Sequence, residues 1–472
     1  MGLLALSLVG QAQCQYYEKF FEVDGGPEYM YYFSKVQVGS NRADQSVIID
    51  TGSDTLAFPC DSCERNECGT HQDPRFQTSG SSSFKYSINC SNRILFRSSN
   101  VCQFVKSYAE GSSLLGFLAE DYLKFKNTHR MNDLRLKKLN AMMQKDFRMK
   151  AEFGCTTKET GLFKTQFADG ILGLDDGSTF IQSIEDENSS NRHKVFSFGL
   201  CFHNTGGIMS IDLRERNRND APITVLSRNP GELDHPVAVR YTSDNSYFEV
   251  YTERFEVGNM RLDLDGINVM VDSGTTFTHF PTEYIQAIMK ALNMFCASSS
   301  DRCGRIKGAV FNEESCLQFK QPDDTYKNVK ELLDTFPEIK FYFKGSNKPY
   351  IIYPKNYFYQ EYDEVKDNPE IKLCMALKGE EEGRIILGAF SMIDNYFYFD
   401  RKAKMLRIYK EDCFLRAALI LKKDRVLEES RGWRQNGVNW LTVGVSVLGV
   451  CVLVRSLLGR YNRTRTSIEI KG

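Results

Sequence analysis

Short apolar runs separated by polar turns recur along most of the chain, and this spacing predicts β-strands rather than long helices. Many of the runs are rich in aromatic and β-branched residues, as is typical of strands. One stretch, residues 282–292, instead has the apolar spacing of an amphipathic helix. We therefore expect a mostly all-β protein. The clearest strand-like runs are residues 29–38, 47–50, 102–106, 114–118, 196–202, 336–343, 350–354, 396–401 and 404–409.

Two apolar runs far apart in the chain end in the same way. Residues 47–53 read VIIDTGS, and residues 269–276 read VMVDSGTT. Each run delivers one Asp to a turn made of a hydroxyl residue and a Gly, and the Gly lets the backbone bend sharply beside the carboxyl group. The turn residues are Asp50, Thr51, Gly52 and Ser53 in the first segment and Asp272, Ser273, Gly274 and Thr275 in the second.

Each Asp segment is followed much later by two apolar residues and a Gly. These are Ile171-Leu172-Gly173 after the first segment and Ile386-Leu387-Gly388 after the second. The order and spacing of the motifs therefore repeat, which indicates a duplicated unit with one Asp in each half. A chain of 472 residues is also too long for one ordinary domain, so two lobes are expected. The alternative is two unrelated strand-to-turn boundaries.

These segments resemble the pepsin-like aspartic proteases, in which each of two lobes supplies one Asp to a central cleft. The resemblance covers residues 29–413 and implies that family's bilobal fold, with an extended polypeptide substrate in the cleft. Two carboxylates so close cannot both ionise, so they share one proton and activate a water. The implied catalytic residues are Asp50 and Asp272. Supporting roles fall to Thr51, Gly52, Ser53, Ser273, Gly274 and Thr275, with hydroxyls that hold the turns together and orient the carboxylates.

A polar stretch with one Gly, residues 107–112 (SYAEGS), separates two strand-like runs and predicts the tip of a hairpin. In the pepsin-like family a hairpin with a Tyr in this place forms the flap that closes over substrate. The resemblance thus assigns Tyr108 and Gly111 to the flap. A carboxylate at Glu110 would favour a basic substrate side chain beside the scissile bond. The alternative for Glu110 is a solvated turn residue.

Both ends of the chain suggest the secretory pathway. Residues 1–12 resemble a secretory signal that lacks its basic start, so we expect the natural N-terminus to lie upstream. Residues 435–454 carry no charge and are long enough to span a bilayer, and Arg residues follow them. A buried helix is the alternative there. The predicted order is an N-terminal lobe at 13–203, a C-terminal lobe at 204–413, a juxtamembrane linker at 414–434, a transmembrane helix at 435–454 and a cytosolic tail at 455–472.

The 14 Cys fit an oxidising compartment such as the lumen of the secretory pathway or the cell exterior. Cys296 and Cys303 are expected to close a small loop, and Asn188 is a predicted glycosylation site in a loop. The spacing of Cys60, Cys63 and Cys68, with His71 nearby, also allows a zinc site, but no second Cys pair completes it. We therefore favour a disulfide-linked insertion at 60–102.

Charge and composition exclude several other functions. The formal net charge is −1, and no basic stripe is interleaved with aromatic residues, so nucleic-acid binding is disfavoured. The 6 His form no His-Glu-x-x-His pair, which argues against a zinc hydrolase. We expect a monomer without a metal or organic cofactor, whose partners are a polypeptide substrate and the membrane.

Within the family, the Cys cluster from Cys60, the flap pattern at 108–112 and the C-terminal apolar stretch resemble the plasmepsin V and nepenthesin-like branch. This implies cleavage of secretory-pathway proteins near a basic residue. The alternatives are a general acidic or vacuolar endopeptidase without that preference and a non-catalytic membrane receptor. The resemblance also implies the disulfides Cys201–Cys413 and Cys316–Cys374. Pairing stays open among Cys60, Cys63, Cys68, Cys90, Cys102 and Cys155.

Overall fold

The residues described by the computed structural model all lie within residues 1–418, the first of the two units into which the chain divides. The expected signal peptide, Asn188, the membrane span and the tail all lie outside the described residues. Within the described part, no helix is long and apolar enough to cross a membrane. The described residues are 18–64, 66–88, 97–98, 101–126, 148–187, 195, 197–212, 236–305, 310–320, 328–361, 370–381 and 383–414.

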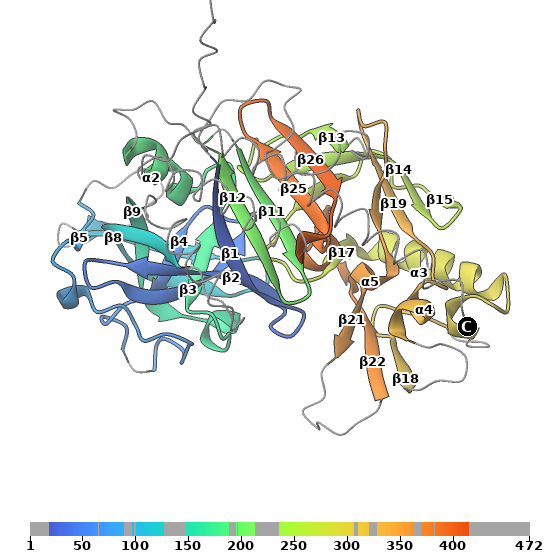
Figure 1. Ribbon diagram of the computed structural model, residues 1–472, viewed down its shortest axis with the longest axis horizontal. Coiled ribbons are helices and arrows are strands. Elements are labelled where there is room, and N and C mark those ends of the chain that lie inside the picture. Colours follow the sequence, from blue (N-terminus) through green and yellow to red (C-terminus); the bar gives the residue numbers. More distant parts are fainter. Residues whose placement is uncertain are drawn as a thin grey trace, which may run out of the picture. The chain divides into compact units, whose positions relative to one another are not determined.

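The largest sheet has 15 strands and contains both the beginning and the end of the described chain (Figure 1). Its strands run in the order β13-β26-β25-β11-β12-β1-β2-β3-β10-β4-β9-β8-β7-β6, with β5 beside β8. Their bounds are β1 (Glu18–Gly26), β2 (Tyr31–Val38), β3 (Ala43–Asp50), β4 (Leu56–Pro59), β5 (Lys85–Tyr86), β6 (Arg97–Ser98), β7 (Val101–Ser107), β8 (Ser113–Lys126), β9 (Arg148–Glu159), β10 (Gly170–Gly173), β11 (Ser197–His203), β12 (Gly206–Asp212), β13 (Val237–Arg240), β25 (Asn395–Asp400) and β26 (Met405–Lys410).

Two smaller sheets lie in the second half of the chain. An 8-stranded sheet contains β14 (Glu249–Val257), β15 (Met260–Leu262), β16 (Asn268–Val271), β17 (Thr278–Pro281), β19 (Ile339–Phe343), β20 (Tyr350–Ile352), β23 (Leu377–Glu380) and β24 (Ile385–Leu387). A 3-stranded sheet contains β18 (Cys316–Lys320), β21 (Phe358–Glu361) and β22 (Glu370–Met375). The helices are α2 (Thr179–Glu187), α3 (Thr282–Ala297), α4 (Val329–Leu333), α5 (Pro354–Tyr357) and α6 (Ala389–Met392), with 3-10 turns at Thr78–Gly80, Gly161–Lys164 and Cys303–Arg305.

The mostly β character expected from the sequence is confirmed, with corrections at the ends of elements. Strand β19 starts at Ile339 rather than at residue 336 because Pro337 has no N–H to donate to a ladder. Strand β20 ends at Ile352 because Pro354 begins helix α5. Helix α3 continues beyond residue 292 to Ala297. Its buried residues follow the helical period, at Ile285, Ile288, Met289, Ala291 and Leu292.

The duplication predicted from the two Asp segments is visible in the strand pairing. Strand β3 lies parallel to β10, with Asp50 opposite Gly173, and β16 lies parallel to β24, with Val271 opposite Leu387. After each Asp the chain returns as β4 or β17, antiparallel to β10 or β24. These two strands in turn lie parallel to β9 and β23. The same topology therefore occurs once in each half.

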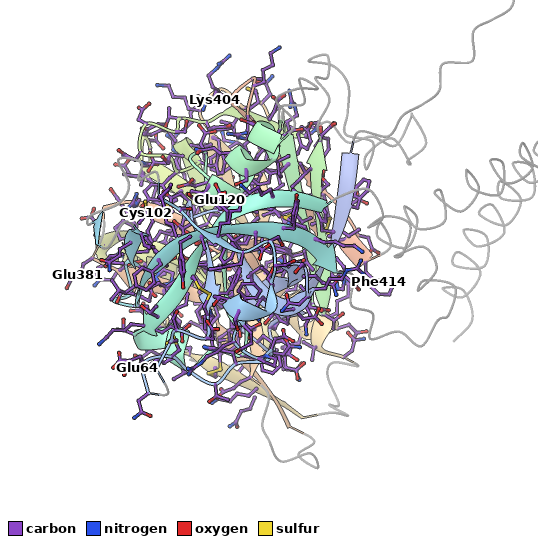
Figure 2. All side chains as sticks on the ribbon, turned by 90° about the vertical axis from the view of Figure 1, so that its left-hand side faces the viewer. Glu64, Cys102, Glu120, Glu381, Lys404 and Phe414 are labelled. Carbon is purple, nitrogen blue, oxygen red and sulfur yellow. A yellow bond between two sulfur atoms is a disulfide. The ribbon has the colours of Figure 1, made fainter. Side chains whose placement is uncertain are left out.

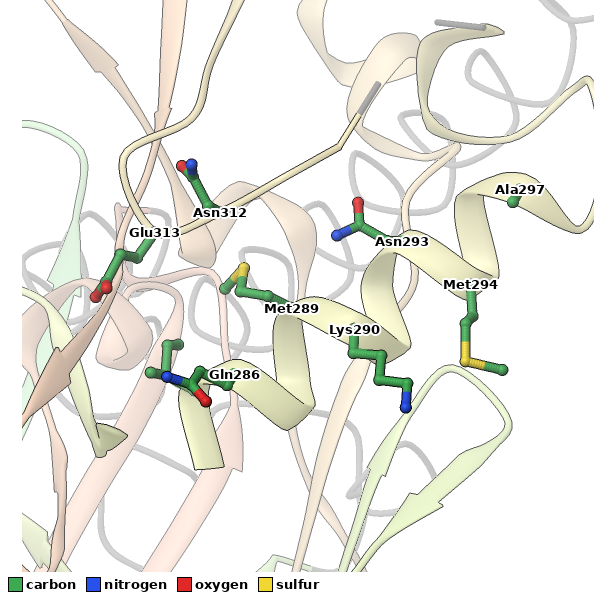
Figure 3. Close-up of a pocket in the computed structure, with 9 residues that line it drawn as sticks. Gln286, Met289, Lys290, Asn293, Met294, Ala297, Asn312 and Glu313 are labelled. Carbon is green, nitrogen blue, oxygen red and sulfur yellow. The ribbon is translucent and has the colours of Figure 1, made fainter. Parts of the chain in front are cut away.

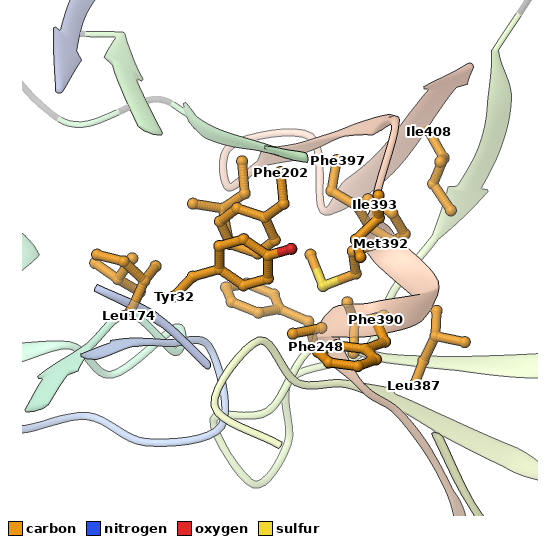
Figure 4. Close-up of a cluster of buried hydrophobic side chains, with 14 of the residues drawn as sticks. Tyr32, Leu174, Phe202, Phe248, Leu387, Phe390, Met392, Ile393, Phe397 and Ile408 are labelled. Carbon is orange, nitrogen blue, oxygen red and sulfur yellow. The ribbon is translucent and has the colours of Figure 1, made fainter. Parts of the chain in front are cut away.

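Strands from both halves share the middle of the large sheet. Strand β11 pairs with β12 on one side and with β25 on the other, and β12 pairs with β1. Figure 4 shows the buried cluster beside these strands, in which the ring of Tyr32 stacks on Phe202 at 4.1 Å. The Tyr32 hydroxyl donates to the carbonyl of His203 at 3.0 Å. These contacts join β2 to the shared strands.

Five disulfides are resolved among the described residues, and they indicate an oxidising, non-cytosolic environment. Three of these disulfides were expected from the sequence: Cys201–Cys413, Cys296–Cys303 and Cys316–Cys374. Cys60 bonds Cys155 and Cys63 bonds Cys68, which the sequence left open. Outward-facing charged residues include Glu64, within the loop that Cys63–Cys68 closes, and Glu381 (Figure 2).

Candidate active site

The two Asp residues predicted from the sequence come together at the ends of equivalent strands. Asp50 ends β3, and Asp272 directly follows β16. Both are buried, with 4% and 8% of their surface exposed. The two carboxylates are held in matching ways, because Gly52 N–H donates to Asp50 Oδ1 at 2.7 Å and Gly274 N–H to Asp272 Oδ1 at 2.8 Å.

Hydroxyl groups bind the other carboxylate oxygens. Ser53 Oγ donates to Asp50 Oδ2, and Thr275 Oγ1 donates to Asp272 Oδ2 at 2.6 Å. Each carboxylate thus receives one backbone and one side-chain hydrogen bond. Fixed donors of this kind hold the two groups in defined orientations.

The turns themselves are joined by hydrogen bonds that cross between the two halves. Thr51 Oγ1 donates to the carbonyl of Val271 at 2.9 Å and accepts from Ser273 N–H at 2.9 Å. In return, Ser273 Oγ donates to the carbonyl of Ile49 at 2.8 Å and accepts from Thr51 N–H at 3.0 Å. Both residues are fully buried, so these bonds are shielded from water.

The close approach of the two turns explains the Gly in each motif. A Cβ added at Gly52 would lie 2.6 Å from the Asp272 carboxyl carbon. A Cβ at Gly274 would lie 2.3 Å from Asp50 Oδ1. Each Gly therefore lies against the Asp of the opposite half, where no side chain fits.

The electrostatics of the pair follow from burial and like charge. Burial raises the pKa of Asp50 well above its ordinary value, and the charge of Asp272 raises it further. The hydrogen bonds from Ser53 and Gly52 act in the opposite direction. A proton is therefore retained on the pair at a pH where an isolated Asp would be ionised. One protonated and one ionised carboxyl group side by side can act as acid and base in the same step.

The predicted flap is a hairpin of β7 and β8, and its tip lies near Asp50. The ring of Tyr108 packs on Phe163 with 4.9 Å between the ring centroids, and its buried hydroxyl lies beside Ser53 and Asp50. Burial raises the pKa of Tyr108 well above its ordinary value, and the neighbouring Asp50 adds to this. The tip is closed by Gly111 N–H, which donates to the carbonyl of Tyr108 at 3.0 Å. Tyr108 is thus the flap residue that lies beside the carboxylates.

Glu110 lies at the exposed tip of this hairpin. Its charge also contributes to the raised pKa of Tyr108, which places its carboxylate in the electrostatic neighbourhood of the flap Tyr. The tip accommodates the bend through Gly111, whose φ of 90° lies in the left-handed region. The hairpin therefore presents a carboxylate at its solvent-facing end.

Tyr247 is a residue near the pair that sequence patterns did not reveal. Burial raises its pKa, the Arg384 guanidinium lowers it, and Asp175, Asp272 and Asp50 each raise it. Arg384 lies over its ring at 5.3 Å. Tyr247 thus approaches the carboxylates from the second half of the chain, while Tyr108 approaches from the first. It belongs to no motif, so only the folded chain identifies it.

The Cys cluster does not form the zinc site that its spacing allowed. Cys60, Cys63 and Cys68 are all in disulfides. The fourth candidate ligand, His71, binds Glu159 through Nε2 at 2.9 Å and contacts the carbonyl of Gln166 through Nδ1 at 3.0 Å. Burial lowers the pKa of His71, but the hydrogen bond to Glu159 and the charge of that carboxylate raise it, and the net effect is a raised pKa. His71 is therefore a structural residue that ties the Cys-rich segment to β9.

A pocket in the second half of the chain lies away from the carboxylate pair. It has a volume of about 590 Å³ and follows the exposed side of α3 (Figure 3). Met289, Lys290, Asn293 and Met294 line one side, and Asn312 and Glu313 line the other. Neither the two Asp turns nor the hairpin tip at residues 108–111 contributes to its lining, so this pocket is separate from the carboxylate pair.

The fold and the paired Asp turns define a class of protein. The sequence matches the family model for eukaryotic aspartyl proteases over residues 31–410, and the chain belongs to that family. It is a pepsin-like aspartic endopeptidase, and its substrate is a polypeptide bound in the cleft between the two Asp-bearing halves.

Individual relatives are similar to this chain at low identity. Plasmepsin V of Plasmodium falciparum is 22% identical over 84% of this chain and 73% of its own length. Aspartic protease 5 of Toxoplasma gondii is 28% identical over 52% of this chain and 28% of its own length. Aspartyl protease AED1 of Arabidopsis thaliana is 23% identical, with 67% of this chain and 59% of the relative covered.

Replacement of Thr51 tests the bonds between the turns. Thr51→Val keeps the shape but leaves Ser273 N–H and the carbonyl of Val271 without their partner. Each unpaired buried group costs about 1–3 kcal/mol, so for two groups we expect a loss of about 2–6 kcal/mol in the free energy of unfolding. Urea denaturation measures it. Thr157→Val, at a partly exposed hydroxyl, is the control and should cost less than about 1 kcal/mol. Equal losses would contradict the role of Thr51.

Replacement of Asp50 tests the electrostatics of the pair. The folded-state pKa of Asp50 is raised, so its contribution to stability is full below the unfolded pKa of about 3.9 and is lost as pH rises through the folded value. Asp50→Asn does not titrate, so its stability relative to wild type should increase from pH 4 to pH 7. Urea denaturation at each pH measures the difference. The exposed Asp263→Asn is the control. A difference that does not change with pH would refute the raised pKa.

Proposed function

We propose that this protein cleaves proteins of the secretory pathway, with Asp50 and Asp272 as the catalytic pair and with a preference for a basic residue near the cut. The observation that carries the catalytic assignment is the matched pair of buried carboxylates, each held by one Gly N–H and one hydroxyl. Both come from one chain, so we propose that a monomer is active.

In the proposed mechanism, the pair shares one proton and holds a water between its carboxylates. The ionised carboxyl group takes a proton from this water as the water oxygen attacks the scissile carbonyl carbon. The protonated carboxyl group donates to the carbonyl oxygen, which gives a neutral tetrahedral intermediate. Transfer of a proton to the leaving nitrogen then breaks the C–N bond. The pair titrates as a unit, so the shared proton is not assigned to either Asp.

The residues around the pair have distinct proposed roles. Thr51 and Ser273 keep the two turns in contact, while Ser53 and Thr275 orient the outer carboxylate oxygens. Tyr108 would cover the reacting groups and exclude water from them, as its buried hydroxyl beside Asp50 suggests. The chemistry requires only the two carboxyl groups and a water.

The basic preference rests on Glu110. Its carboxylate is exposed at the flap tip, close enough to Tyr108 to influence the pKa of that residue. A substrate passing under the flap would meet this negative charge near the scissile bond. An Arg guanidinium can bind a carboxylate with two parallel hydrogen bonds, which makes Arg the best-matched side chain. A solvated Glu110 would leave the endopeptidase without this preference.

We further propose that the enzyme is attached to a secretory-pathway membrane by residues 435–454, with its disulfide-bonded body in the lumen or outside the cell. The absence of charge over this stretch and the Arg residues that follow it support this. The full chain should sediment with membranes after alkaline carbonate extraction, and a chain truncated after Asp424 should be recovered in the soluble luminal or secreted fraction. A soluble full chain would refute the anchor.

Cleavage of a diverse peptide library tests the catalytic assignment. The luminal body, ending near Asp424, should cut peptides in at least part of the range from acid to neutral pH. Asp272→Asn should reduce the rate about 10²- to 10⁴-fold, because it removes the shared proton chemistry. Cleavage site and rate are read by mass spectrometry. If Asp272→Asn cuts as fast as wild type, the shared-proton mechanism is wrong.

The same library tests Glu110. Glu110→Ala should lower the preference for Arg near the cut by about 10-fold, equivalent to about 1.4 kcal/mol, while peptides without a basic residue keep their rates. Glu64→Ala is the matched control, because Glu64 is an exposed carboxylate on the Cys-rich segment. A wild-type enzyme that shows no basic preference remains an aspartic endopeptidase, but the proposed preference is then rejected.

A further inference from the structure

The flap strand β7 carries a second side chain that reaches the catalytic turn. Lys106 Nζ lies 2.7 Å from Asp54 Oδ1. The two side chains are 28% and 17% exposed, so the ion pair is partly shielded from water. Lys106 lies near the end of β7, and Tyr108 is the first residue after that strand. This part of the hairpin therefore approaches the segment around Asp50 at two points, through Lys106 at Asp54 and through Tyr108 beside Asp50.

Asp54 is a firm attachment point. It directly follows Ser53, which donates to the carboxylate of Asp50. Its own carboxylate accepts from Thr55 Oγ1 at 2.6 Å. Its carbonyl accepts from Thr179 N–H at 2.8 Å and from Thr179 Oγ1 at 3.1 Å, at the start of α2. The residue that Lys106 binds is thus held by three further hydrogen bonds.

The other limb of the flap is attached by different bonds. Ser113 N–H donates to Thr160 Oγ1 at 2.8 Å, and Thr160 N–H donates to the carbonyl of Ser113 at 3.0 Å. Leu162 N–H donates to Ser112 Oγ at 2.9 Å. Between these attachments lie residues 108–111, and Ala109, Glu110 and Gly111 in this tip are exposed. Both limbs are therefore held at their base, and the exposed tip extends beyond the attachments.

We propose that Lys106 is a positioning residue for the flap: its ion pair with Asp54 fixes strand β7 to the catalytic turn, holds Tyr108 beside Ser53 and Asp50, and confines flap opening to residues 108–111. The proposal rests on the protease mechanism above, because it assigns Lys106 a role in admitting and holding substrate. A flap held at its base loses less conformational freedom when substrate binds, which strengthens binding.

Loss of the ion pair should therefore weaken substrate binding more than it slows the chemical step. For Lys106→Met we expect kcat/KM to fall about three- to tenfold, mainly through a higher KM. Lys106→Arg restores a cation of similar reach and should recover most of the loss. Asp54→Asn should match Lys106→Met, and the double variant should be no worse than either single variant, since both remove the same pair.

The control is Lys158→Met on β9. Lys158 also forms an ion pair, at 2.9 Å to Glu67, but the side chains are 50% and 37% exposed and neither belongs to the flap. The experiment measures kcat and KM for one peptide that wild type cuts, together with amide hydrogen exchange of residues 101–113. Faster exchange at the flap in Lys106→Met, but not in Lys158→Met, is the expected result. Urea denaturation should give similar stabilities for the two Met variants.

Several outcomes would overturn the proposal. One is that Lys106→Met behaves like Lys158→Met in both KM and exchange. Another is that Lys106→Arg fails to restore KM, because the charge would then not be the cause. A third is a double variant whose losses add. If wild type cuts no peptide, the protease function fails, but flap exchange still tests the attachment: unchanged exchange in Lys106→Met refutes it, and faster exchange supports it.

Discussion

The carboxylates of Asp50 and Asp272 would repel each other if both were ionised, and hydrogen bonds between the two turns hold them together. Thr51 and Ser273 make four hydrogen bonds to backbone groups of the opposite half. These groups are buried, so water does not compete for the bonds. Gly52 and Gly274 allow the approach, because any side chain there would occupy the space of the opposite carboxylate. The parallel strands β10 and β24 support the two Asp-bearing strands from the side. Burial and the charge of the adjacent Asp272 together raise the pKa of Asp50.

Around this symmetric centre the two halves differ. The first half contributes the flap and the Cys-rich segment, which is held by Cys60–Cys155 and by the buried contact of His71 with Glu159. The second half contributes Tyr247, with Arg384 over its ring, and the 3-stranded sheet that β18 begins. The pair itself is nearly symmetric, so among the described residues it is these additions that make the chemistry differ on its two sides.

Much of the centre could be predicted from the sequence, because the chemistry constrains it. A carboxylate at a tight turn needs a Gly and a hydroxyl next to it in the chain, and that local requirement appears as a motif at Asp50 and again at Asp272. The hairpin was predicted in the same way, from its turn residues, and its role as a flap was implied by the resemblance to the pepsin-like family. Tyr247, Asp54 and Lys106 were missed because their roles depend on contacts between distant segments. The pairing Cys60–Cys155, 95 residues apart, depends likewise on the folded sheet, in which β4 lies beside β9. Strand ends were misplaced where a single Pro decides them.

The arrangement of the strands along the chain also determines when, during synthesis, the protein can become proteolytically active. Strand β25, which pairs with β11, and Cys413, which is bonded to Cys201, are among the last described parts of the chain to leave the ribosome. Until residue 272 is made there is only one carboxylate, and until residue 387 is made its supporting strand β24 is incomplete. Both carboxylates and both supporting strands are therefore present only after residue 387 has been made. A nascent chain that has not reached this residue cannot yet assemble the pair, so proteolytic activity cannot precede this point of its synthesis.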